Sequence, residues 1–431
     1  MTALTDLLDL TGDACSVLTD KRRGKNVRLS MRDIGLAAFS VFFMQSPSFL
    51  SHQRQLCKGA GQGRSNCQSL LGMQDIPSDN HIRDMLDNVE PSSLYRLFDE
   101  ALAAVETAGA LPSLACLGDH ILIAMDGTQY FCSKNLSCQN CSTRQRSGGG
   151  TEYFHTLLAA SIVTPGKNWV LPLPPEFVQP QDGHDKQDCE SRAMRRWLDL
   201  HAARYNRLNP VYLGDDLYSR QPLCEAVLAS GGHFLFVCKP ESHKTLHEYL
   251  AGIHLPTRSE MVRHGKKRAC HSWRWMENVP IRDGGDALMV NWLEMTIRDA
   301  SGKITYRNSF VTDLPVSSAN VAELADAGRA RWKIENETFN VLKTKGYNLE
   351  HNFGHGKASL SAVLATLNLI AFAIHAAAGL ADQTWKAAVK AAGARINFFN
   401  NLRALTVFVL FSTWESLLKT LAFQTPPLIP P

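Results

Sequence analysis

The stretch ILIAMDGTQY, residues 121–130, begins with an apolar run rich in isoleucine and places the acidic residue Asp126 directly after it. The stretch PVYLGDDLYS, residues 210–219, repeats this arrangement with Asp215. Short apolar runs bounded by turn residues are typical of buried strands. We therefore expect two strands, each ending at a carboxylate.

Further apolar runs place these two strands in one sheet. The elements expected after the first strand are, in chain order, strands at 155–163 and 169–173, a helix at about 188–208, a strand at 211–214, a helix at 221–229 and a strand at 233–238. The order β-β-β-α-β-α-β indicates a mixed α/β sheet covered by helices. We expect its fourth strand beside the first, which would bring Asp126 and Asp215 together. Glu190 falls in the first turn of a helix, where an acid suits the helix dipole; a supporting role beside the neighbouring Cys189 is the alternative.

A third acidic residue, Glu335, lies in the helical stretch ARWKIENETF. A helix packed across the sheet edge would bring it to Asp126 and to Asp215, for which Asp216 is the alternative. Unpaired carboxylates so close repel one another unless a cation joins them, and Mg²⁺ or Mn²⁺ prefers such oxygen ligands. The alternative is that each acid separately caps a strand or a turn, but the sheet order favours a shared site.

Together these stretches resemble the DDE-type transposases of bacterial insertion sequences, in the insertion-sequence-four group or a close relative. The features that match are DGT at Asp126, Asp215 followed by Tyr218, RWxIExxxF around Glu335, and the long strand-rich insertion between the last two acids. Over about residues 115–375, the resemblance implies a ribonuclease H-like catalytic fold. It also implies that the three acids hold two divalent cations, Mg²⁺ or Mn²⁺.

The activity implied by the resemblance is cut-and-paste transposition, in which a strand is hydrolysed at the transposon end and the freed 3′-hydroxyl attacks target DNA. Its partners would be double-stranded DNA at the ends and the target, and a homodimer would form in the DNA complex. Two alternatives remain open. One is another two-metal DNA nuclease, and the other is a transposase-derived DNA-binding protein that has lost the chemistry.

The family also carries a Tyr-Arg-Glu-Lys signature on its last helix. Arg331 matches the arginine, four positions before Glu335 and on the same helical face. The tyrosine position falls on Gly328 and the lysine position on Leu342, with Lys343 one step late and expected to reach a DNA phosphate. Glu337 should point away from the face of Glu335.

Cysteines close to the first strand indicate a second kind of metal site. Cys138 and Cys141 have the Cys-x-x-Cys spacing of half a tetrahedral zinc site. The other ligands are open among Cys132, His155 and Cys189. The alternatives are reduced thiols in a loop and, for His155, a part in the acidic site.

The predicted insertion, residues 241–320, combines strand-like sequence with basic residues and tryptophans. Basic side chains neutralise DNA phosphates, and an aromatic side chain can stack on a flipped base, as in similar transposases. Core packing is the alternative for each tryptophan. The candidate DNA-binding residues here are Lys266, Lys267, Arg268, Trp273 and Trp275, together with Arg263 and Arg274.

The flanking regions are expected to be helical. Residues 1–115 form the region expected to bind DNA ends, residues 116–240 and 321–375 the catalytic domain, and residues 376–431 a C-terminal helical region. Near the N-terminus, six basic residues form either a solvated tail or a contact to the DNA backbone: Lys21, Arg22, Arg23, Lys25, Arg28 and Arg32.

The composition is that of an ordinary globular protein. Of its 431 residues, 45% are hydrophobic and 20% charged, which suits two or three domains with their own cores. The net charge of +4 permits a nucleic-acid partner without requiring one. Eleven cysteines without a secretory signal favour a cytoplasmic protein with reduced or metal-bound thiols. The apolar stretch 361–378 contains polar residues and is interpreted as a buried helix rather than a membrane span.

Overall fold

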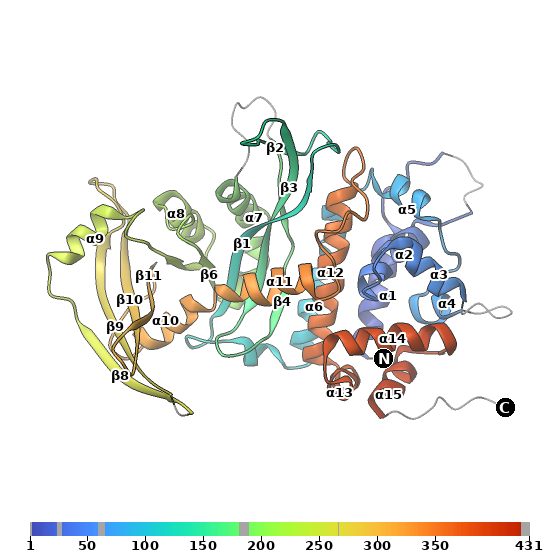
Figure 1. Ribbon diagram of the computed structural model, residues 1–431. Helices are drawn as coiled ribbons and strands as arrows, with labels where there is room; N and C mark the ends of the chain where they lie inside the picture. Colours follow the sequence, from blue (N-terminus) through green and yellow to red (C-terminus); the bar gives the residue numbers. More distant parts are fainter. Residues whose placement is uncertain (1, 24–27, 59–64, 181–188, 266, 424–431) are drawn as a thin grey trace.

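A mixed α/β sheet with helical N- and C-terminal regions forms the fold, which confirms the predicted fold class (Figure 1). The computed structural model describes residues 2–23, 28–58, 65–180, 189–265 and 267–423. Within them, eleven strands form one sheet with the order β2-β3-β1-β6-β7-β11-β10-β9-β8, and β4 and β5 both pair with β3.

The strands are β1 (Ile121–Ser133), β2 (Ser142–Gln145), β3 (Thr151–Val163), β4 (Val170–Pro172), β5 (Glu176–Val178), β6 (Pro210–Gly214), β7 (His233–Val237), β8 (Thr257–His264), β9 (Lys267–Pro280), β10 (Met289–Asp299) and β11 (Ile304–Thr312).

The N-terminal helices are α1 (Ala3–Ser16), α2 (Met31–Phe43), α3 (Phe49–Lys58), α4 (Asn66–Leu71), α5 (Asp79–Leu86), the 3₁₀ turn η1 (Pro91–Leu94), α6 (Arg96–Thr107) and the 3₁₀ turn η2 (Leu111–Leu114). Those between the strands are α7 (Glu190–Tyr205), the 3₁₀ turn η3 (Asn206–Leu208), α8 (Gln221–Ala229) and α9 (Lys244–Ala251). After the sheet come α10 (Val321–Arg329), the π-helical turn η4 (Ile334–Phe339), α11 (Asn340–Thr344), α12 (Leu360–Ala381), α13 (Gln383–Ala392), α14 (Arg395–Phe408) and α15 (Trp414–Phe423).

The strands β1, which contains Asp126, and β6, which ends just before Asp215, are neighbours, as their order in the sequence predicts. β1 and β6 pair in parallel, from Ile121 opposite Pro210 to Ala124 opposite Leu213. The expectation that β1 ends at Asp126 was wrong, because β1 continues to Ser133 with β3 as its antiparallel partner. Asp126 therefore lies within a strand, at the point where the parallel neighbour β6 ends.

The strand-rich insertion extends the same sheet. β11 pairs antiparallel with β7, and β10, β9 and β8 follow outward (Figure 1). Helix α9 opens this segment, where the sequence had indicated only strands and turns. Trp273, Trp275 and Trp292 are all buried in the core that these strands form. The insertion is thus joined through β7 to β6, the strand that ends just before Asp215.

Helix α12 packs against β4 and against the N-terminal helices α2 and α6, and it lies between β4 and α2 (Figure 1). Among the described residues it is the one helix long and apolar enough to cross a membrane, but 89% of its most apolar window is buried within the protein. The prediction of a buried core helix at this position is confirmed. The C-terminal helix α14 contacts α3, so the two ends of the chain form one helical region.

Candidate functional site

Asp126 and Asp215 lie level with each other at the end of β6. Continuing the parallel register of β1 and β6 by two residues places Asp215 opposite Asp126. The turn after β6 holds Asp215 in place, because its Oδ1 accepts a hydrogen bond from the Leu217 N–H at 2.8 Å. Its carbonyl accepts a second one from the Tyr218 N–H at 3.1 Å. The sheet thus brings together two carboxylates that are far apart in sequence.

Asp216 is directed elsewhere. Its Oδ1 accepts a hydrogen bond from the Lys239 N–H at 2.6 Å, and its Oδ2 accepts one from the Ser242 hydroxyl. His243 Nε2 lies 3.8 Å from its Oδ1. These contacts tie Asp216 to the segment after β7, so the geometry favours Asp215 over Asp216 as the residue that faces Asp126.

Glu335 reaches the same place from the helical segment after α10. It lies in the π-helical turn η4, which packs on β1, β3 and β4. Such turns are frequent at functional sites. Arg331 Nη2 donates to Glu335 Oε1 at 2.6 Å, and its Nη1 donates to Asp126 Oδ2 at 3.3 Å. Because the side chain of Glu335 is half exposed, this side of the site opens to solvent.

Two departures from the expected helix signature have structural causes. At Gly328, a Cβ atom would lie 2.7 Å from the ring of Phe310, so α10 can approach β11 this closely only without a side chain there. Leu342 is fully buried. The Lys343 ammonium group forms an ion pair with Glu350 at 2.8 Å and is therefore already paired within the protein.

Glu190 is a further acid at this site, whereas the sequence favoured a helix-dipole contact for it and left a supporting role beside Cys189 as the alternative. Its carboxylate fills the space next to Gly127, at which a Cβ atom would lie 2.2 Å from Glu190 Cδ. Tyr218 donates a hydrogen bond to Glu190 Oε2 at 3.3 Å. Because successive strand residues face opposite sides of a sheet, Glu190 approaches β1 from the side opposite to the side chain of Asp126. The glycine after the aspartate was the sequence signal for this close approach.

The site contains more acidic than basic side chains, and this excess affects the pKa values of its carboxyl groups. Burial raises the pKa of Asp126 to about 7, although the Arg331 guanidinium opposes this rise. The charges of Asp215, Glu190 and Glu335 raise it further. Burial also raises the pKa of Glu190, with the charge of Asp215 adding to the effect. Carboxylates that destabilise one another in this way are suited to hold a divalent cation, which would favour their charged forms.

A second cluster lies farther along the β1–β3 hairpin. The ligand atoms of Cys138, Cys141, His155 and His355 all lie within 4.8 Å of one another. The sequence indicated the first three of these residues. It missed His355, which lies 214 residues after Cys141 in a segment without a recognisable ligand spacing.

Two other proposed ligands lie outside this cluster. Cys132 is exposed and contacts Arg144, whose Nη2 lies 4.0 Å from its sulfur. Cys189 is exposed at the N-cap of α7. The alternative role of His155 in the acidic site is also not supported, because its Nε2 faces Cys138 and Cys141.

The tryptophans proposed to stack on DNA bases are core residues. Trp273 and Trp275 are 3% and 9% exposed, so neither ring face is free for a base. Their burial favours the core alternative. Arg274 is paired with Glu294 at 2.6 Å. Arg268 is exposed, whereas Lys266 and the side chain of Lys267 lie outside the described residues.

Several basic side chains near the N-terminus are paired within the protein, and Lys25 lies outside the described residues. The ion pairs are Lys21–Asp84 at 2.6 Å, Arg22–Asp20 at 2.7 Å and Arg32–Asp13 at 3.0 Å. At least these three side chains are therefore not a free solvated tail.

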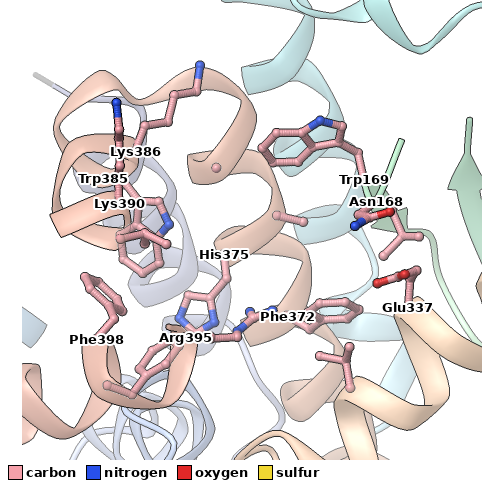
Figure 2. Close-up of a pocket in the computed structure, with 16 residues that line it drawn as sticks. Asn168, Trp169, Glu337, Phe372, His375, Trp385, Lys386, Lys390, Arg395 and Phe398 are labelled. Atoms are coloured by element: carbon pink, nitrogen blue, oxygen red, sulfur yellow. The ribbon is translucent and has the colours of Figure 1, made fainter. Parts of the chain in front are cut away.

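A largely apolar cavity of about 500 Å³ lies beside α12, α13 and α14 (Figure 2). Trp169 and Trp385 line opposite sides of it. Glu337 also lines it, whereas Glu335 is held at the acidic site by Arg331. The two glutamates of η4 therefore face different surroundings, as their spacing predicts. The cavity is not lined by Asp126, Asp215 or Glu335.

Comparison with known families supports a DDE-type transposase. Residues 177–373 match the family model described as a transposase DDE domain. This match covers less than half of the chain, including Asp215 and Glu335, and begins after Asp126. A comparison with curated proteins finds no match.

Proposed function

We propose that the protein is a cut-and-paste DNA transposase of the insertion-sequence-four type. The observation that carries the proposal is the convergence of Asp126, Asp215 and Glu335 from β1, β6 and η4 around Arg331. Two of these acids fall in the part of the chain that matches a transposase DDE domain. In the reaction, water attacks the phosphorus at the transposon end and leaves a free 3′-hydroxyl, which then attacks a phosphorus of the target DNA.

The donor set fits hard divalent cations. Asp126, Asp215 and Glu335 offer carboxylate oxygens, which Mg²⁺ and Mn²⁺ prefer. Burial raises the pKa of Asp126 to about 7, and the neighbouring charges of Asp215, Glu190 and Glu335 add to the rise against the opposing effect of Arg331. Two cations held by these acids would stabilise the attacking and leaving oxygens of an in-line displacement.

The other residues of the chain have roles in holding the acids and the DNA. Arg331 fixes the orientation of Glu335 and Asp126 through its two hydrogen bonds. Arg268 of β9 would contact a DNA phosphate, and Lys343 would do so after exchanging Glu350 for DNA. We propose the same role for Lys266 and Lys267. We propose end recognition by residues 1–115, pairing of two ends in a homodimer, and a cytoplasmic location.

Two other functions use the same residues differently. A general two-metal nuclease would cut DNA without regard to end sequence, and a silent DNA-binding protein would bind ends without cutting. The long insertion, joined to the sheet through β11 and β7, favours the transposase over the nuclease. The three acids, brought into one place, favour it over the silent protein.

The test is cleavage of DNA that carries the inverted repeats flanking the coding region. We expect Mn²⁺-dependent nicking at the repeat boundary, joining of the 3′-end to a second DNA, and loss of both in Asp126→Ala. DNA with a scrambled repeat is the control. Equal cutting of the scrambled DNA would indicate the nuclease, and binding without nicking would indicate the silent protein.

A further inference from the structure

Ligands from three separate segments meet in the Cys/His cluster. Cys138 and Cys141 come from the loop between β1 and β2, His155 comes from β3, and His355 comes from the segment between α11 and α12. We propose that these four residues bind one structural zinc ion, which joins the β1–β3 hairpin to the segment that precedes α12.

The distances within the cluster are those of a zinc tetrahedron. With Zn–S near 2.3 Å and Zn–N near 2.05 Å, the edges of a tetrahedral site measure about 3.8 Å for S–S, about 3.6 Å for S–N and about 3.3 Å for N–N. The observed S–S distance, Cys138 to Cys141, is 3.8 Å. Three of the four S–N distances are 3.5, 3.4 and 3.4 Å, the fourth, from Cys138 Sγ to His355 Nε2, is within 4.8 Å, and His155 Nε2 lies 3.2 Å from His355 Nε2. Five of the six edges are thus within about 0.2 Å of those of a tetrahedral zinc site.

Hydrogen bonds around the cluster orient the side chains of the proposed ligands. His355 Nδ1 lies 3.0 Å from the Gly356 carbonyl, which can only accept, so Nδ1 carries the proton and Nε2 presents its lone pair to the ion. The Cys138 N–H donates to Cys141 Sγ at 3.4 Å, and the Cys141 N–H donates to the Cys138 carbonyl at 3.2 Å.

A disulfide and a pair of free thiols explain the cluster less well. A disulfide requires the sulfurs to approach to about 2.05 Å, far less than the 3.8 Å between Cys138 and Cys141. Free thiols explain neither why two imidazoles turn their Nε2 atoms toward the sulfurs nor why those atoms lie only 3.2 Å apart. Soft thiolate and imidazole ligands in a tetrahedron select zinc rather than Mg²⁺ or Mn²⁺.

The segment that carries His355 also binds the N-terminal helical region. Asp87, at the C-terminal end of α5, accepts hydrogen bonds from the backbone N–H groups of Lys357, Ala358 and Leu360 at 2.9 to 3.0 Å. Asn140, between the two cysteines, donates to the Ala358 carbonyl at 3.1 Å. The zinc ion would therefore join the catalytic sheet to a segment that is itself fixed on the N-terminal helices. Its loss should loosen this junction and leave the acidic site able to bind its own cations.

The test is the zinc content and coordination of the full-length protein purified without chelator. We expect about one zinc per chain, and X-ray absorption with two sulfur and two nitrogen ligands at about 2.3 and 2.0 Å. His355→Ala and Cys141→Ser should lose most of the zinc, whereas Cys132→Ser and Cys189→Ser, the matched cysteine controls, should retain it. Wild-type protein with less than about 0.3 zinc per chain would overturn the proposal, as would full retention of zinc by His355→Ala.

A second measurement uses the wild-type protein, in case the variants fold poorly. Removal of zinc with a chelator should lower the melting temperature by about 5 °C or more. It should also speed amide hydrogen exchange at Lys357 and Ala358, and re-addition of zinc should restore both. An unchanged melting temperature and unchanged exchange after complete zinc removal would overturn the structural role. Asp126→Ala should keep its zinc, so the fate of this site is independent of the proposed transposase chemistry.

Discussion

Arg331 forms an ion pair with Asp126, with Nη1 lying 3.3 Å from Oδ2, although 205 residues separate the two in sequence. The other arm of the same guanidinium holds Glu335 at 2.6 Å. A positive side chain therefore lies where the acids of β1 and η4 converge. In the absence of a cation it partly balances their charges, and it fixes their directions.

Replacing Arg331 should separate cation binding from catalysis. In Arg331→Ala, Mn²⁺ should bind at least as tightly as in the wild type, because a competing positive charge has been removed. Cleavage of end DNA should fall about 10- to 100-fold, because Glu335 loses the partner that orients it. Calorimetric titration with Mn²⁺ and single-turnover cleavage measure the two effects.

Arg329→Ala is the matched control for this change. Arg329 lies one half-turn earlier and contacts Asp326 at 3.4 Å and the ring of Tyr306, rather than Asp126 or Glu335. It should keep cation affinity near that of the wild type. Loss of Mn²⁺ binding in Arg331→Ala but not in Arg329→Ala would contradict the view that Arg331 competes with the cation.

The stability of cation-free protein should depend on pH through Asp126. Burial raises its folded-state pKa from the ordinary 3.8 to about 7, so the folded protein holds the proton more tightly than the unfolded chain. The resulting stabilisation is fully present below about pH 4 and is lost as pH rises through about 7. The free energy of unfolding, measured with chelator present, should therefore fall over this range relative to Asp126→Asn. A difference between the two proteins that stays constant from pH 4.5 to 8 would contradict this.

Neighbouring aspartates at the end of β6 should behave differently. Asp215→Asn should weaken Mn²⁺ binding strongly, because its carboxylate is a proposed ligand. Asp216→Asn should keep Mn²⁺ binding but cost about 1 to 3 kcal/mol of stability, because Asp216 holds Lys239 N–H and the Ser242 hydroxyl. Calorimetry and denaturant unfolding distinguish them, and the reverse pattern would make Asp216 the ligand.

A methyl group at Gly127 should disturb the site through Glu190. In Gly127→Ala the new Cβ would lie 2.2 Å from Glu190 Cδ, so the carboxylate must move. We expect reduced stability and reduced cleavage. In Gly127→Ala/Glu190→Ala the shorter side chain makes room, and the effect of the alanine at 127 should largely disappear. A double-mutant cycle measures this coupling, and additive effects would show that the two residues do not act on each other.

Much of the acidic site could be predicted because its parts are local in sequence. Each acid follows or lies in a recognisable run, and the order of the runs gives the neighbours β1 and β6. The end of β1 was predicted wrongly, since its extension to Ser133 depends on pairing with β3, a long-range contact. Glu190 was missed for a similar reason. A helix-start acid has a local explanation, and only the close approach to Gly127 shows its second role.

For the Cys/His cluster, too, only the ligands with a local sequence signal could be predicted. The Cys-x-x-Cys spacing is a local signal, and His155 was among the candidate ligands because it begins the next predicted strand. The position of His355 depends on the path of the chain after α11 and on the hydrogen bonds by which Asp87 holds its segment. Neither can be predicted from the local sequence. The tryptophans of the insertion were ambiguous for another reason. A Trp beside basic residues has the same sequence pattern whether it stacks on a base or fills a core, and the pairing of β9 with β10 buries Trp273 and Trp275.

The most direct test of the central claim is single-turnover cleavage of end DNA in Mn²⁺ by Asp126→Asn, Asp215→Asn and Glu335→Gln. Glu337→Gln is the control, because Glu337 lies on the same turn but lines the separate cavity. Cation stabilisation of transition-state charge is worth several kcal/mol, so we expect each of the three variants to lose at least about 1,000-fold in rate. Glu337→Gln should stay within about threefold of the wild type, a change of well under 1 kcal/mol. Cleavage near the wild-type rate by any one of the three acid variants would contradict the claim that these acids form one catalytic site.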